Sequence, residues 1–417
     1  MSKRQNESQI SGPDSELEYL LSTAAINERC AKVLKMAESG GTHFKVDFGQ
    51  MDALANYVAA VTRENYPDLK IPFHSRWRHF DAGGVARNKM LEQKLSTLTP
   101  EERIKSRLDL VVASVLLDAG AGTSWGYQEK STGSRVARSE GLAVASLHMF
   151  LEGGFSSNPA NPYQVDAAGL AAITRETLAR AFQVNEKNPL VGLDGRLGLL
   201  HSLGRVLKTL PAFFGKDAAP RIGNILSPLQ ALASQRSLRA TQILTTLQKS
   251  LGSIWPGRVM FGDFNLGDVW PYAPLGSGAA GLIPFHKLSQ WLTLSMVDPL
   301  EESGLKITHF EELTGLPEYR NGGLFIDLRL LVPRQASDLQ LAHEVDSEFI
   351  VEWRALTVAL LSDLAPRVRK LLGKSETELP LGKILEGGTW AAGRKIAKEL
   401  RADASSPLKI ISDGTVF

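Results

Sequence analysis

Arginine, histidine and tryptophan side chains gather in one short stretch of the chain, where Arg76 and Trp77 are flanked by His74 and His79. Guanidinium groups bind carboxylates or phosphates through paired hydrogen bonds, and they also stack on aromatic rings. These residue types therefore predict a site for an anionic ligand that has a planar part. Two alternatives stay open, namely a loop that pins neighbouring helices together and a metal held by the two histidines with Asp81.

A carboxylate, a phenol and a guanidinium follow one another at Glu318, Tyr319 and Arg320. A carboxylate in this company can transfer protons or stabilise a developing positive charge. The alternative interpretation is a structural ion pair between the glutamate and the arginine. We take Glu318 as the first candidate for a catalytic residue, with Tyr319 and Arg320 as candidates for substrate binding.

The residues that precede this carboxylate predict a hairpin of two short helices. Thr308 and Glu311 have the spacing of a capping box, which predicts a helix from His309. Gly315 can adopt the left-handed conformation that ends a helix, and Pro317 suits the first turn of the next one. The second helix would then point its first backbone amides at a phosphate group.

Two further helical segments carry polar residues on faces that should be buried. Lys287, Gln290 and Trp291 share one helix face, which is typical of a pocket wall or of an amphipathic helix with a snorkelling lysine. Asp298, further along the same helix, is the second candidate for the catalytic carboxylate.

Glu352, Trp353 and Arg354 interrupt an otherwise apolar helical segment. Charges that face inward need partners, because an unpaired buried charge is expensive. We expect Trp353 and Arg354 to contact the substrate, with Glu318 and Arg320 as neighbours. A buried structural network of salt bridges is the alternative.

The elements that position these residues are mostly helices, because apolar residues recur at spacings of three and four. We expect a mainly α, multi-helical globular fold with one element that resembles a helix-hairpin-helix. Strand-like alternation is limited to 45–48 and 408–411. The predicted helices span 104–118, 139–152, 166–184, 194–210, 229–251, 285–302 and 346–372, the last interrupted at Pro366.

The chain is expected to have a disordered polar segment at residues 1–17, followed by an N-terminal helical part at 18–264. A C-terminal helical part at 265–417 would close the site, and one continuous domain is the alternative. The Gly- and Pro-rich stretch at 265–281 predicts either a linker or an ordered loop that buries Trp270 and Tyr272.

Composition excludes several classes of protein. The 47 Lys and Arg residues nearly balance the 45 Asp and Glu residues, which argues against a dedicated nucleic-acid binder. A single cysteine, Cys30, excludes a disulfide framework, and no apolar run is long enough to span a membrane. We therefore expect a cytoplasmic protein. The sequence lacks GxxxxGK[ST], HExxH, CxxC and GxSxG, so it indicates no cofactor and no metal.

Several segments together resemble the uracil catabolism protein 4 family, and the resemblance runs from about residue 18 to the end of the chain. The family is associated with a pyrimidine-degrading route that makes uracil into its nucleotide and opens the ring with a cyclohydrolase-like enzyme. The segments are SRWRHFDAGG (75–84), LLDAGAG (116–122), SEGLAVAS (139–146), NPLVGLDGR (188–196), PFHKLSQWLTLSMVDP (284–299), LTGLPEYRNGG (313–323), VEWRALTVALL (351–361), LEGGTWAAGR (385–394) and the final SDGTVF (412–417).

A fainter resemblance links three of these segments to the queuosine-nucleotide N-glycosylases, which are all-α and similar in shape to helix-hairpin-helix DNA glycosylases. Phe285, Lys287 and Gln290 match the start of a Phe-Tyr-Lys-Arg-Ala-Gln helix. The segments 317–320 and 352–355 stand in the places of Ala-Asp-Tyr-Arg and Glu-Ile-Arg-Ala. The likeness implies a nucleotide-derived small-molecule substrate.

Both resemblances imply hydrolysis of the N-glycosidic bond of a ring-opened uridine nucleotide, such as ribosylurea or its 5-phosphate. A carboxylate at Glu318 or Asp298 would act on the sugar, while Arg76, Lys287, Arg320 and Arg354 bind the anion. Aromatic walls would come from Trp77, Trp291 and Trp353, with His79, Gln290 and Tyr319 completing the substrate site.

Two other functions stay open. The protein could be an amidohydrolase that cleaves the ureido-acyl bond of the opened ring, with a metal at His74, His79, Asp81 or His286. It could also be a non-catalytic partner that binds the ring-opening enzyme and shields a labile intermediate.

Overall fold

Helices dominate the computed structural model, which describes residues 13–122, 124–216, 219–255 and 259–411, so the mainly α prediction is confirmed. The apolar positions that predicted the helices form their buried faces. The α-helices are α1 (Pro13–Leu20), α2 (Thr23–Glu38), α3 (Met51–Asn65), α4 (Arg76–Phe80), α5 (Arg87–Leu95), α6 (Pro100–Leu116), α7 (Arg138–Leu151), α8 (Ala167–Ala172), α9 (Arg175–Ala181), α10 (Leu193–Thr209), α11 (Pro211–Phe214), α12 (Leu226–Leu232), α13 (Ala240–Leu251), α14 (Lys287–Glu302), α15 (Tyr319–Asp327), α16 (Glu348–Leu372), α17 (Leu381–Ile384) and α18 (Trp390–Leu400).

The strands in the described part of the chain are short and form two-stranded pairs. β1 (Phe44–Val46) pairs with β10 (Leu331–Pro333), β2 (Gly126–Gln128) with β3 (Arg135–Ala137), β5 (Met260–Phe261) with β6 (Phe264–Asn265), and β7 (Val269–Pro271) with β8 (Leu282–Pro284), all antiparallel. β4 (Ser237–Arg239) pairs with β9 (Lys306–Thr308), and β11 (Ala342–Glu344) with β12 (Lys409–Ile411), both parallel.

Three of the predicted helices differ from the structure. The segment 166–184 is split after α8, where Thr174 caps the start of α9 with its side chain. The segment 229–251 is split by β4: α12 ends at Leu232, Ala233 is extended, and Gln235 and Arg236 then adopt positive φ angles before β4 begins. By contrast, α16 continues through Pro366 to Leu372 without a break.

The hairpin of two helices predicted before Glu318 takes a different form. Thr308, the expected N-cap of its first helix, is the last residue of β9, which pairs with β4, and His309 adopts a left-handed φ of 57°. A single 3-10 turn at Phe310–Glu312 follows, and an extended stretch then leads to α15. The pairing with β4 satisfies the backbone groups that a helix would otherwise have used.

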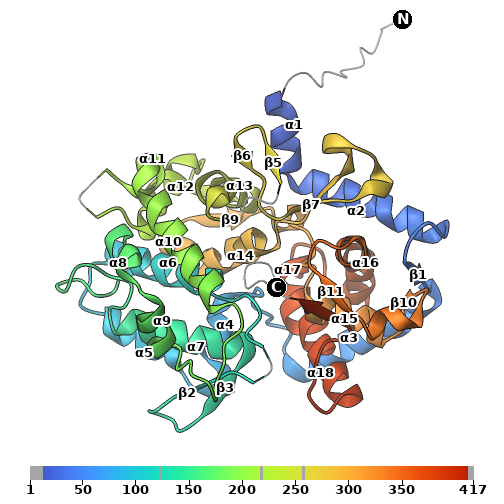
Figure 1. Ribbon diagram of the computed structural model, residues 1–417, viewed down its shortest axis with the longest axis horizontal. Helices are drawn as coiled ribbons and strands as arrows, with labels where there is room; N and C mark the ends of the chain where they lie inside the picture. Colours follow the sequence, from blue (N-terminus) through green and yellow to red (C-terminus); the bar gives the residue numbers. More distant parts are fainter. Residues whose placement is uncertain (1–12, 123, 217–218, 256–258, 412–417) are drawn as a thin grey trace, which may run out of the picture.

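The two halves expected at 18–264 and 265–417 share one hydrophobic core. α2 and α3 pack against α16, and β1 pairs with β10, so the first and last parts of the chain lie side by side (Figure 1). α4 to α13 form the opposite side, with α14 packed between α6 and α13. The stretch 265–281 is ordered and contains β7, and Trp270 and Tyr272 are buried in it.

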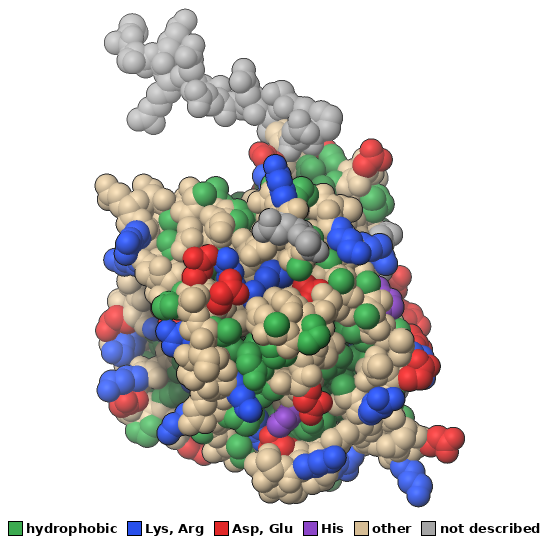
Figure 2. All heavy atoms as spheres, turned by 90° about the vertical axis from the view of Figure 1, so that its left-hand side faces the viewer, with side chains coloured by type: hydrophobic (Ala, Val, Ile, Leu, Met, Phe, Trp, Pro, Cys, Tyr) green, Lys and Arg blue, Asp and Glu red, His purple; other side chains and the backbone are tan. Residues whose placement is uncertain are grey.

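The expected disordered segment at 1–17 and the final SDGTVF fall largely outside the described residues, although residues 13–17 belong to α1. No described helix combines the length and apolarity that a bilayer span requires. Cys30 is buried, and burial raises the pKa of its thiol. Acidic and basic side chains are interspersed over the face shown in Figure 2, in line with the balanced composition.

Candidate functional site

A cavity of about 930 Å³ lies between the two sides of the molecule. Cavities of this size hold a drug-sized or nucleotide-sized ligand. Its lining comes from the ends of α4 and α6, the starts of α7, α14 and α15, from α18, and from the segment 403–410 that precedes and includes β12. The polar or aromatic lining residues are His74, His79, Asp118, Arg138, Ser139, Glu140, Lys287, Trp291, Glu318, Tyr319, Arg320, Asp327, Arg329, Gln340, Trp390, Arg394, Arg401, Asp403, Ser405, Ser406 and Lys409.

Glu318 lies on the cavity wall as the N-cap of α15. One carboxylate oxygen accepts from the backbone N–H of Arg320 at 2.7 Å, and the other accepts from that of Asn321 at 2.6 Å. These bonds satisfy amides that have no partner within the helix. The carboxylate is therefore held in one orientation at the edge of the cavity.

Lys287, the first residue of α14, also lines the cavity. Burial, and then the charge of Arg354, lower the pKa of Lys287 to about 8, against the opposing effects of Asp268 and Glu318. An ammonium group with this pKa can lose its proton near neutral pH.

The start of α14 is fixed by Asp268, which lies in the loop between β6 and β7. Asp268 accepts two hydrogen bonds from Arg354, each 2.8 Å long, and one from the backbone N–H of Lys287 at 2.9 Å. Trp270 Nε1 donates a fourth at 2.6 Å. Burial alone would raise the pKa of Asp268, but Arg354 and these hydrogen bonds hold it well below its ordinary value.

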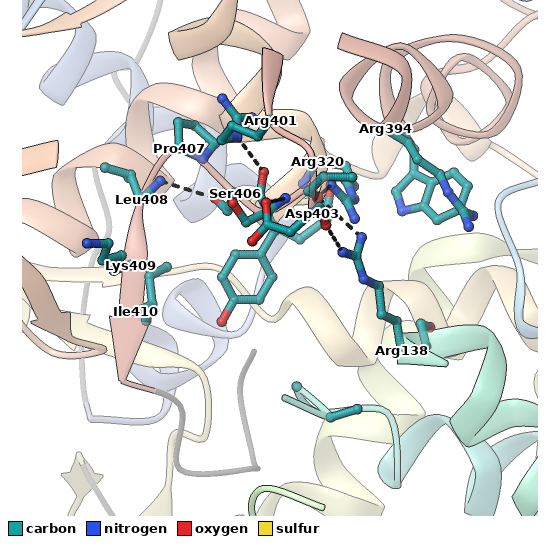
Figure 3. Close-up of a pocket in the computed structure, with 18 of the residues that line it drawn as sticks. Arg138, Arg320, Arg394, Arg401, Asp403, Ser406, Pro407, Leu408, Lys409 and Ile410 are labelled. Atoms are coloured by element: carbon teal, nitrogen blue, oxygen red, sulfur yellow. Dashed lines mark hydrogen bonds between the residues drawn. The ribbon is translucent and has the colours of Figure 1, made fainter. Parts of the chain in front are cut away.

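Four of the five described arginines that line the cavity differ in how they are engaged (Figure 3). Arg138 donates to the backbone oxygens of Asp403 and Ala404, at 2.5 and 3.2 Å, and Arg320 donates to that of Ala404 at 3.0 Å. The other two are paired with carboxylates, Arg401 with Asp327 and Arg394 with Glu140. Arg138 and Arg320 thus donate hydrogen bonds to neutral carbonyl groups, and an anionic ligand can replace those carbonyls as the acceptor.

Two histidines and two tryptophans form an aromatic cluster on one wall of the cavity. The ring of His79 lies 5.5 Å from that of Trp291 and 5.7 Å from that of Trp390. His74 lies 5.9 Å from Trp291 and 5.5 Å from Trp390, and its Nδ1 is 2.7 Å from Glu386. The cluster offers flat faces to a planar group.

A buried polar chain supports this cluster from behind. Arg76 contacts Asp118 at 2.5 Å, and Ser139 Oγ lies 2.7 Å from each oxygen of Asp118. His79 Nδ1 lies 2.9 Å from Ser139 Oγ, and His79 Nε2 has no hydrogen-bond partner in the described part of the chain. Burial, and then the charges of Arg76, His74 and Arg394, lower the pKa of His79 well below its ordinary value.

The structure brings six of the sequence-derived candidates to the cavity and places the others outside its lining. His79, Lys287, Trp291, Glu318 and the adjoining Tyr319 and Arg320 line it, and Arg76 lies directly behind His79. Outside the lining are Trp77, Gln290, Asp298, Trp353 and Arg354.

Each of these outlying residues has another environment. Asp298 is exposed on α14, and Trp77 Nε1 donates to the backbone oxygen of Ser295 at 2.7 Å. Gln290 holds Thr314 through its side-chain amide, while Trp353 packs beneath α15. Arg354 is the buried partner of Asp268, so its guanidinium is engaged before any ligand binds.

Several residues of the site were not among the candidates. Asp118, Ser139, Arg138, Trp390 and Arg394 come from segments whose composition is mostly apolar or glycine-rich. Asp118, Ser139, Trp390 and Arg394 lie in the motifs LLDAGAG (116–122), SEGLAVAS (139–146) and LEGGTWAAGR (385–394), and these motifs were the sequence feature that could have indicated them.

The described residues contain no group of three or more His, Cys, Asp or Glu side chains that could hold a metal ion. His286, one of the possible ligands, is buried and lies 2.9 Å from the backbone oxygen of Leu20 through its Nε2. The metal-dependent alternative therefore has no donor set in the part of the chain that the structure describes.

Comparisons with known proteins extend over nearly the whole chain. Residues 19–417 match the family model described as "Protein of unknown function (DUF1688)". The chain belongs to this family. It is 42% identical to Protein urg3 of Schizosaccharomyces pombe over 95% of this chain and 98% of that protein. It is 35% identical to Uracil catabolism protein 4 of Lachancea kluyveri over 97% of this chain and 99% of that protein. The resemblance to the uracil catabolism protein 4 family is thereby confirmed.

Proposed function

We propose that this member of the DUF1688 family acts in uracil catabolism and hydrolyses the N-glycosidic bond of a ring-opened uridine nucleotide of the ribosylurea type. The role in uracil catabolism rests on the name of the Lachancea kluyveri relative. The reaction rests chiefly on one observation, the carboxylate of Glu318 held by two backbone amides beside arginines and tryptophans in one cavity.

In the proposed reaction the bond between the sugar carbon C1′ and the urea nitrogen breaks, and its electron pair goes to the nitrogen. Lys287 donates a proton to that nitrogen, for which its pKa of about 8 is well suited. Glu318 stabilises the positive charge that develops on the sugar, and it accepts a proton from the water that attacks C1′. Solvent then carries this proton back to Lys287, which restores both groups.

A 5-phosphate on the substrate would bind at Arg138 and Arg320. Charge-assisted hydrogen bonds to phosphate are stronger than those to a neutral carbonyl, so the phosphate would replace Asp403 and Ala404 as acceptors. Arg394, whose guanidinium lies 5.4 Å above the ring of Trp390, borders the same space. The sugar and its ureido group would then extend from the arginines toward the aromatic cluster.

The test is to incubate the purified protein with ribosylurea and with its 5-phosphate and to identify the products by mass spectrometry. We expect urea together with ribose or ribose 5-phosphate. The Glu318→Gln variant should lose turnover, whereas Glu311→Gln, which alters an exposed glutamate outside the cavity, should retain it. Failure to consume either compound would contradict the proposal.

A further inference from the structure

The side chain of His79 is held by a chain of three polar groups. Arg76 contacts Asp118 at 2.5 Å and also donates from Nε to Ser114 Oγ at 2.7 Å. Ser139 Oγ lies 2.7 Å from both oxygens of Asp118 and 2.9 Å from His79 Nδ1. His79, Ser139 and Asp118 line the same cavity, and His79 is only 5% exposed.

These distances favour one of the two ring nitrogens as the site of the proton. Ser139 has one hydroxyl hydrogen, and the carboxylate of Asp118, paired with Arg76, is the stronger acceptor for it. Arg76 Nη1 lies 3.4 Å from His79 Nδ1 but closer, at 3.2 Å, to the backbone oxygen of Ser139, which takes its hydrogen bond. Ser139 Oγ, 2.9 Å from Nδ1, then accepts the hydrogen bond from Nδ1–H of His79. His79 is therefore neutral with its hydrogen on Nδ1, and Nε2 presents a lone pair.

Nε2 of His79 has no partner among the described residues, although the ring is buried and lines the cavity. A buried acceptor without a hydrogen bond is destabilising, and a donor on a ligand would remove that cost. The polar chain behind the ring keeps it from turning to find another partner.

The surroundings of this acceptor exclude charged ligand groups. Arg76 and Arg394 are close enough to depress the pKa of the ring, so a cationic donor would be repelled. An anionic group has no hydrogen to offer the lone pair. The rings of Trp291 and Trp390 flank the imidazole at 5.5 and 5.7 Å, which favours a flat ligand group.

We propose that this corner of the cavity is a recognition site for a neutral, planar amide-type group, and that the terminal NH₂ of a ureido group donates to Nε2 of His79. Ser139 and Asp118 act as positioning residues, since they fix the tautomer that leaves Nε2 as an acceptor. The identity of the ureido ligand rests on the proposed function, whereas the preference for a neutral N–H donor rests on the geometry of His79.

The test compares two ligands of nearly the same shape by calorimetry. Ribosylurea carries the terminal NH₂, and N-acetylribosylamine carries a methyl group in its place. The titrations use Glu318→Gln protein, so that neither ligand is consumed. We expect ribosylurea to bind about tenfold or more tightly than the acetyl compound, because only ribosylurea satisfies the buried acceptor.

The His79→Phe change in the same background keeps a flat ring but removes the acceptor, and it should abolish the discrimination between the two ligands. Ser139→Ala should reduce the discrimination, since Nδ1 loses its acceptor. His201→Phe, a matched change at a histidine whose Nε2 lies 2.8 Å from the backbone oxygen of Ile173 outside the cavity, should leave it intact. Circular dichroism checks that each variant is folded.

Equal affinity for the two ligands in Glu318→Gln protein that retains His79 would by itself overturn the inference. Unchanged discrimination in folded His79→Phe protein would overturn it as well. The outcome for the proposed reaction is separate. If the protein binds ribosylurea more tightly than the acetyl compound but never releases urea, the recognition site stands and the glycosidase reaction is refuted. If it releases urea but binds the two ligands equally, the reaction stands and the recognition site is refuted.

Discussion

The ion pair between Asp268 and Arg354 offers a quantitative test of how the site is supported. Arg354 is fully buried in α16, and Asp268 is 17% exposed. The carboxylate accepts four hydrogen bonds, two from Arg354, one from Trp270 and one from the backbone of Lys287. Replacing Asp268 by Asn keeps the shape of the side chain but leaves the buried guanidinium without a counter-charge.

Breaking a buried ion pair by removing one partner costs about 3–5 kcal/mol. Asn retains one oxygen that can still accept from Arg354 or Trp270, so we expect Asp268→Asn to destabilise the protein by about 3 kcal/mol, the lower end of that range. The pKa of Lys287 should also fall below about 8, because Asp268 raises this pKa and Arg354 lowers it.

Urea denaturation followed by circular dichroism measures the loss of stability. The matched control is the double variant with Arg354→Met, which removes the stranded charge and should recover part of the stability. A destabilisation below about 1 kcal/mol in Asp268→Asn, or a double variant less stable than Asp268→Asn alone, would show that the ion pair does not stabilise the start of α14.

Three other predictions concern pH and packing. If the Lys287 ammonium donates the proton, kcat/KM should fall as pH rises through about 8. In Lys287→Arg protein this fall should occur at higher pH, which a pH–rate profile measures. A fall at the same pH in both proteins would contradict the role of Lys287. Hydrogen bonds from Arg87 lower the pKa of Glu129 to about 2, so its stabilising effect is present above the unfolded pKa of about 4.3 and is lost as pH falls toward 2. The gap in urea midpoint between wild type and Glu129→Gln should therefore shrink between pH 5 and pH 2, and a constant gap would refute this assignment. Gly393→Ala would place a Cβ 2.1 Å from a backbone oxygen of α15 and should lower the free energy of unfolding by about 1–3 kcal/mol. Gly198→Ala meets nothing within 4 Å and should raise the free energy of unfolding by about 0.5–1 kcal/mol. Thermal unfolding compares the two variants, and equal effects would contradict the close approach of α18 to α15.

Helix periodicity predicted the class of fold and several site residues for a simple physical reason. Lys287 and Trp291 are four residues apart on one helix, so both reach the cavity once either does. The same face also carries Gln290, which turns instead to Thr314 and holds the loop before Glu318. Periodicity defines a helix face, but it does not show which neighbour that face meets.

The remaining site residues depend on long-range contacts that no local pattern specifies. Arg354 was assigned to substrate binding because its partner Asp268 lies in a Gly- and Pro-rich stretch far away in the sequence. Ser139 and Asp118 gain their roles only when α4, α6 and α7 come together around His79. The hairpin prediction before Glu318 was wrong in its first half because pairing with β4 outweighed the local capping signal.

The most direct test of the account measures urea release from ribosylurea 5-phosphate by NMR, with wild-type protein and Glu318→Gln in parallel. The account predicts that the wild type releases urea and ribose 5-phosphate in equal amounts, and that the variant, with the same fold by circular dichroism, is slower by about 10²-fold or more. Equal rates in the two proteins, or no urea from the wild type, would contradict the claim that a fixed carboxylate at the start of α15 acts on the sugar.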